Sequence, residues 1–125
     1  MLEIATIVYI VCGKPVDVDE ICKFINKLPF RSYQSGEKSY RHFEVDLIDD
    51  GLASSLGDSI RDFLKHIDII ILTHNISISS FFDVAVYVKN TGGTGSLKVD
   101  ENTICELQRF NSHLEFSFYP VGDEE

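Results

Sequence analysis

Four segments of the chain have the apolar pattern of β-strands. Residues 4–12 ("IATIVYIVC") are apolar on both alternating faces, which predicts a central strand. Residues 41–47 alternate strictly between apolar and polar side chains, which predicts a strand with one solvated face. Residues 80–88 and 112–119 complete the set of predicted strands.

Helical spacing predicts three helices between these strands. Asp17 can cap a first helix that Pro29 ends, and residues 30–40 then have the polar, aperiodic pattern of a loop. Apolar positions keep helical spacing over about 53–73, although the run "IDIIIL" has strand propensity. Asp100 can cap a short helix that ends before Asn111.

The two halves of the chain share an order of short motifs. V-Y-φ, V-D, I-C and H-φ-E occur in residues 1–50 and again in residues 80–119. Two β-α-β pseudo-repeats joined by the 53–73 helix predict a single α/β (α+β) domain. We expect a two-layer sandwich of ferredoxin-like type, with four main strands and an acidic tail at 120–125.

Composition favours a folded, acidic protein. The 125 residues include nine Phe and five Tyr, and 20 Asp and Glu against 11 Lys and Arg give a net charge of −9. This charge repels nucleic acid and anionic membranes, and it favours a basic protein as partner. No sequence motif indicates a cofactor site.

The cysteines and the N-terminus indicate a cytoplasmic protein. Cys12, Cys22 and Cys105 are odd in number and lack C-x-x-C spacing, which suits a reducing compartment. Glu3 lies where a signal peptide would be basic, so we interpret the apolar start as a strand.

The glycine-rich stretch "NTGGTGS" (90–96) lies between a predicted strand and a predicted helix, where phosphates are often bound. Its spacing matches neither the dinucleotide fingerprint nor the P-loop, and the acidic Asp100 follows it. We therefore expect a flexible connector.

Histidines and carboxylates alternate along two of the predicted strands. If these strands are neighbours, their side chains could converge on a metal or acid/base site, but any solvent-facing strand shows the same alternation. These residues are His42, Glu44 and Asp46 on one strand, and His113 and Glu115 on the other.

A surface that mixes aromatic and acidic side chains is the other candidate site. Strand parity can place aromatic anchors and carboxylates on one sheet face, which suits a basic protein partner, although the tyrosines could equally just cover the sheet. The predicted partner-binding residues are Tyr9, Glu44, Asp46, Asp83, Tyr87 and Glu115.

Several segments taken together resemble a bacterial family, the domain-of-unknown-function family four-two-seven-nine. They are "VYIV", "VDVDEICKFINKLP", "SGEKSY", "VAVYV", "VDENTICELQRF" and "LEFSFYP", with Leu28-Pro29 and Gly36-Glu37 as the more specific marks. The family's tryptophan after the Gly-Glu loop has no counterpart here. The resemblance implies a cytosolic bacterial α/β domain and supplies no catalytic residues.

In size, acidity and lack of catalytic motifs the chain also resembles immunity proteins of bacterial toxin systems. We therefore expect a non-enzymatic domain that binds and neutralises a basic toxin domain, such as a nuclease. The alternatives are an enzyme or a small-ligand or metal-binding domain that uses the His42, Glu44 and Asp46 face or the 30–40 loop, and a self-associating module.

Overall fold

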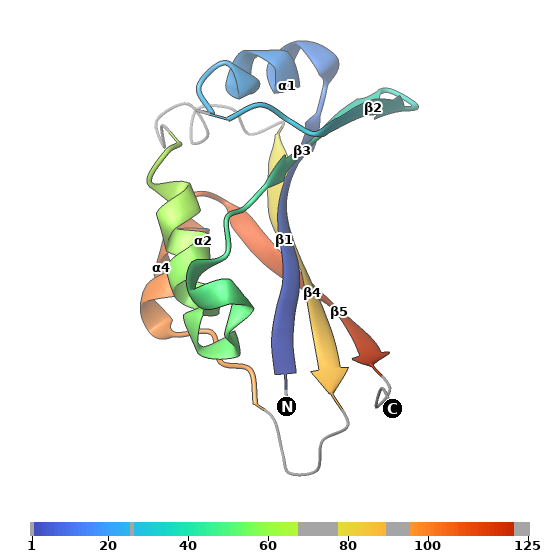
Figure 1. Cartoon of the computed structure of the whole chain (residues 1–125). Coiled ribbons are helices and arrows are strands. Elements are labelled where there is room, and N and C mark those ends of the chain that lie inside the picture. Colours follow the sequence, from blue (N-terminus) through green and yellow to red (C-terminus); the bar gives the residue numbers. More distant parts are fainter. Residues whose placement is uncertain (1, 26, 68–77, 90–95, 122–125) are drawn as a thin grey trace.

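A five-stranded mixed sheet organises the computed structural model, which describes residues 2–25, 27–67, 78–89 and 96–121 (Figure 1). The strand order is β2-β3-β1-β4-β5. All neighbouring strands are antiparallel except β4 and β5, which are parallel and are joined through α4. The strands are β1 (Leu2–Gly13), β2 (Arg31–Ser35), β3 (Lys38–Glu44), β4 (Ser79–Lys89) and β5 (Ser112–Val121).

The described helices cover one face of this sheet. α2 and α4 lie side by side against it, and α1 packs near the end of the sheet where β1 ends and β3 begins (Figure 1). The core between the two layers is apolar, as the alternation of the strands requires. The helices are α1 (Pro15–Cys22), α2 (Leu56–Leu64) and α4 (Glu101–Arg109), with short 3-10 turns η1 (Ile48–Gly51) and η2 (Ala53–Ser55) before α2.

The predicted two-layer α+β architecture is confirmed at this level. The strands expected at 4–12, 80–88 and 112–119 correspond to β1, β4 and β5, and the helix after Asp100 is α4. Among the described residues no helix is long and apolar enough to cross a membrane.

The loop expected at 30–40 is wrong, because most of this segment forms a β-hairpin. β2 and β3 pair antiparallel from Arg31–His42 to Ser35–Lys38. Gly36 has a φ of 62°, a left-handed conformation that a two-residue hairpin turn requires and that glycine adopts without strain. The sheet therefore has five strands rather than four.

Two predicted helices are shorter than expected. α1 begins at Pro15, so Asp17 lies in its first turn instead of at its cap, and it ends at Cys22. α2 is the described part of the helix expected over 53–73; a turn follows Leu64, and Ile67 forms a β-bridge with Ile25. The helix therefore ends before Ile67, and residues 68–73 of the predicted helix lie outside the described part.

The two halves differ in strand pairing. In the second half, α4 connects two parallel neighbours, β4 and β5. In the first half, α1 leads to β2, and β3 lies between β1 and β2. The shared motif order therefore does not translate into two identical β-α-β units.

Candidate functional site: an open sheet face

The sheet face away from the helices carries a row of side chains that crosses all five strands. Ile10 stands at its centre, only 6% exposed because flanking side chains cover it. The registers of neighbouring strands align one residue from each in this central row: Arg31, His42, Ile10, Phe81 and His113.

Aromatic rings pack closely at the β2–β3 end of this face. The Tyr33 and Tyr40 rings stack with centroids 4.8 Å apart and planes 6° apart. The His42 ring lies 5.6 Å from Tyr33 and meets Phe30 edge-on at 5.9 Å. The Arg31 guanidinium sits 4.7 Å from the centre of the Tyr33 ring, a cation–π contact. These contacts hold the rings in fixed positions.

Burial shapes the chemistry of His42. Its Nε2 atom is buried without a hydrogen-bond partner. Burial lowers the pKa of His42 below its ordinary 6.5, the nearby charge of Arg31 lowers it further, and Asp83 acts in the opposite direction. His42 is therefore a neutral, packed side chain at pH 7.

A second row, next to the central one, is acidic. Glu44 and Asp83 flank Val8 on its two sides, and Glu115 pairs with Asp83 on β5. Strands lie about 4.8 Å apart, so this acidic row spans roughly 14 Å. The Glu115 carboxylate lies 2.9 Å from Nε2 of His113. Glu44 and Asp83 form no ion pair with any described residue.

Of the predicted partner-binding residues, four lie on this face. Glu44, Asp83 and Glu115 form the acidic row, and Tyr87 is 41% exposed two rows further along β4. Asp46 lies beyond the end of β3 and pairs with Lys27 at 3.2 Å.

Tyr9 does not belong to this surface. It is 0% exposed and faces the helices, with its ring 4.8 Å from Phe82 and 5.1 Å from Phe63. Its register partner on β3 is Phe43, which is also fully buried, so the pairing places both rings in the core. The expectation of Tyr9 as a binding anchor is wrong for this reason.

The histidines and carboxylates of β3 and β5 do not converge. β1 and β4 lie between these strands, which separates His42 from His113 by three strand spacings, roughly 14 Å. Within the described ranges, no group of three or more His, Cys, Asp and Glu side chains is placed to hold a metal ion.

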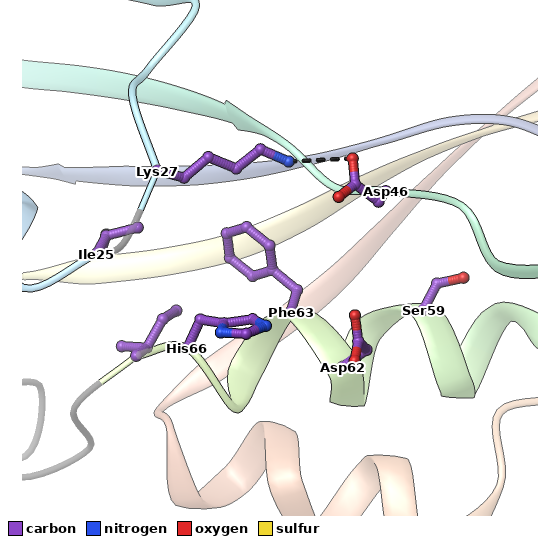
Figure 2. Close-up of a pocket in the computed structure, with 8 residues that line it drawn as sticks. Ile25, Lys27, Asp46, Ser59, Asp62, Phe63 and His66 are labelled. Carbon is purple, nitrogen blue, oxygen red and sulfur yellow. Dashed lines mark hydrogen bonds and ion pairs between the residues drawn. The ribbon is translucent and has the colours of Figure 1, made fainter.

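A small polar pocket lies between α2 and the segments after α1 and β3. Figure 2 shows Lys27 reaching Asp46 on one side, with Asp62 of α2 and His66 of the turn after α2 on the other. Its volume of about 200 Å³ is below the usual range of ligand sites, roughly 300–1,000 Å³. The Lys27–Asp46 ion pair thus joins two chain segments at the edge of the core.

A larger groove opens on the sheet face where β3 ends. It has a volume of about 530 Å³ and is lined by Thr6, Val8, Phe30 and Glu44, among others. Phe30 was not among the predicted partner-binding residues, although its segment, interpreted as the 30–40 loop, was one of the alternative ligand sites. The signal available in the sequence was Gly36-Glu37, a pair that can form a two-residue hairpin turn and that places Phe30 just before a strand.

Comparison of the chain with protein-family models, with curated proteins and with solved structures gives no match. The resemblances to family four-two-seven-nine and to immunity proteins therefore stay predictions.

Proposed function

We propose that this protein is a small acidic protein-binding domain that recognises a basic partner through its open sheet face. The observation that carries the proposal is the acidic row of Glu44, Asp83 and Glu115, which no described helix covers. Carboxylates beside fixed aromatic rings suit a protein partner, because charges steer the encounter and aromatic side chains supply contact area.

We further propose that the partner is a toxin domain and that the protein neutralises it in the cytoplasm, as an immunity protein does. The net charge of −9 supports a basic partner such as a nuclease. The free thiols of Cys12, Cys22 and Cys105 support a reducing compartment. The order of β2, β3, β1 and β4 supports a ferredoxin-like arrangement that α4 and β5 extend.

The test uses the product of the neighbouring gene as partner. We expect the two purified proteins to form a stable complex whose association rate falls with added salt, because the Debye length shrinks from roughly 10 Å at 0.1 M to 3 Å at 1 M. The triple variant Glu44→Gln, Asp83→Asn, Glu115→Gln should associate about ten-fold more slowly at low salt, as measured by stopped-flow or surface plasmon resonance.

A matched control removes three charges from other parts of the surface. Glu20→Gln, Asp62→Asn and Glu101→Gln change exposed acids on the three helices and leave the open face intact. This variant has the same net charge, so a purely global attraction predicts equal slowing in both variants. Equal slowing, or no complex with the neighbouring product, would refute the proposal.

A further inference from the structure

The groove on the open face exists because β3 ends before β1 does. The last β1–β3 register pair is Val8 with Glu44, and the Val45 N–H then donates to the Ile7 carbonyl at 3.0 Å. Beyond this point the chain leaves the sheet toward α2 (Figure 1). The β1–β4 register also shifts between Ile4 and Thr6, as a β-bulge does. A groove of about 530 Å³ therefore opens beside Thr6 and Val8.

Phe30 lines this groove as an exposed but anchored ring. Its side chain is 58% exposed, so the ring is accessible from solvent. Its backbone N–H donates to the His42 carbonyl at 2.9 Å, and the two rings meet edge-on at 83°. The ring can therefore receive a ligand at a small cost in conformational entropy.

Glu44 supplies an uncompensated charge in the same groove. It forms no ion pair with any residue that the structure describes, whereas Asp46, also in the lining, already pairs with Lys27 at 3.2 Å. The groove thus combines an aromatic ring, apolar and hydroxyl side chains of β1, and one available carboxylate.

This combination fits a guanidinium group better than other ligands. A guanidinium stacks on an aromatic ring and binds a carboxylate through two parallel hydrogen bonds, which a lysine ammonium cannot do. An anion would be repelled by Glu44, and a neutral apolar ligand would leave this carboxylate desolvated without a partner. The volume exceeds that of one arginine side chain and leaves room for flanking backbone.

We propose that this groove receives an arginine side chain of the basic partner, with the guanidinium between the Phe30 ring and the Glu44 carboxylate. The inference rests on the proposed function and names the chemistry that this face selects. Arginine is common at the energetic centres of protein interfaces, where it fills a desolvated pocket.

The experiment titrates the ¹⁵N-labelled protein with N-acetyl-L-arginine amide and, separately, with N-acetyl-L-lysine amide. A single side chain is expected to bind with a Kd on the order of millimolar. We expect amide shifts of Thr6, Val8, Phe30 and Glu44 to change together, and the arginine ligand to bind at least about three-fold tighter than the lysine ligand.

Variants test both walls of the groove. Phe30→Ala should weaken arginine binding about five-fold or more, whereas Phe24→Ala, which removes another exposed ring outside the groove, should not. Phe30→Leu keeps an apolar side chain and should also lose the arginine preference, which keeps the test valid if the alanine variant unfolds. Glu44→Gln should weaken binding similarly, and Glu37→Gln at the hairpin turn should not.

Failure of this inference is distinguishable from failure of the proposed function. Shifts spread over the whole acidic row, equal binding of the two ligands, or no shift up to about 50 mM would overturn the arginine groove. If the triple acidic variant still associates with the partner more slowly than the matched control does, the proposed function stands. Groove-specific arginine binding together with unchanged partner binding by the triple variant would overturn the proposed function alone.

Discussion

Replacing Tyr9 with Phe should stabilise the protein, because it removes a buried hydroxyl that has no partner. The Tyr9 ring is fully buried among Phe43, Phe63 and Phe82. Its hydroxyl has no partner in good hydrogen-bonding geometry, and weak hydrogen bonds with the Ser80 and Ser112 hydroxyls offset only part of the rise that burial causes in its pKa. Those two serines bond to each other at 2.5 Å.

The magnitude follows from two opposing effects. A buried hydroxyl without a partner costs about 1–3 kcal/mol, and the atom-sized void left by its removal costs roughly 0.5 kcal/mol. We expect Tyr9→Phe to raise the free energy of unfolding by about 1 kcal/mol at pH 7, which is a rise of about 4 °C in Tm for a domain of this size.

The stabilisation by Tyr9→Phe should increase at alkaline pH. Burial raises the pKa of Tyr9 from 10.0 to about 12, so the unfolded chain loses this proton at a lower pH than the folded protein. The wild type therefore loses stability as pH rises from 10 to 12, and at pH 11 the loss is about 1.4 kcal/mol. Burial also raises the pKa of Cys22 to about 11; this thiol is present in both proteins, and its charge is the smallest of the causes that act on the pKa of Tyr9.

The assay is urea denaturation followed by circular dichroism at pH 7, 9 and 11. The difference between Tyr9→Phe and wild type should increase from about 1 to about 2.4 kcal/mol between pH 7 and 11. Tyr87→Phe, which changes a 41% exposed ring, should stay within about 0.5 kcal/mol of wild type at pH 7. A destabilised Tyr9→Phe at pH 7, or a difference independent of pH, would show that the hydroxyl is hydrogen-bonded in solution.

Two further predictions concern α2 and His42. Gly57→Ala should destabilise the protein by roughly 1–2 kcal/mol, because a Cβ there would collide with the side chains of Asp100 and Thr103 on the α4 side, which outweighs the helix propensity of alanine. In chemical denaturation this cost should shrink in a Thr103→Ala background, and an unchanged cost would exclude the collision. The lowered pKa of His42 means that the unfolded chain takes up a proton first, so stability should be lost as pH falls below 6.5. His42→Phe should flatten this acid limb between pH 7 and 5, and identical limbs would contradict the burial of the imidazole.

The hairpin of β2 and β3 shows what the sequence contained but the interpretation missed. Gly36 and Glu37 form the two-residue turn between β2 and β3, and a glycine at this position is a recognisable turn signal. The side chains of β2 are all exposed, so no apolar periodicity marked the strand. Strand propensity without burial is a weak signal of a β-strand. The strand forms because its backbone can pair with the edge of β3.

Tyr9 shows what the sequence could not reveal. β1 is apolar on both faces, so alternation alone did not indicate which face points toward the helices. The register with Phe43 decides this, and register depends on tertiary packing. The acidic row depends on strand order in the same way. The alternation within each strand places its carboxylate on the solvated face. Only the strand order β3-β1-β4-β5 brings Glu44, Asp83 and Glu115 into one row.

That alignment is also the reason to propose this face as a recognition surface, because it differs from an ordinary solvated face. On a solvated face, carboxylates are usually interspersed with cations that neutralise them. Here Lys89 pairs with Glu3 at 2.8 Å and Arg31 lies over the Tyr33 ring, so neither neutralises the acidic row. The neighbouring rings are already packed against one another and have little entropy left to lose. A face with packed rings and unneutralised carboxylates favours binding of a positively charged partner. The arginine guanidinium suits both groups, because it stacks on aromatic rings and forms paired hydrogen bonds with carboxylates.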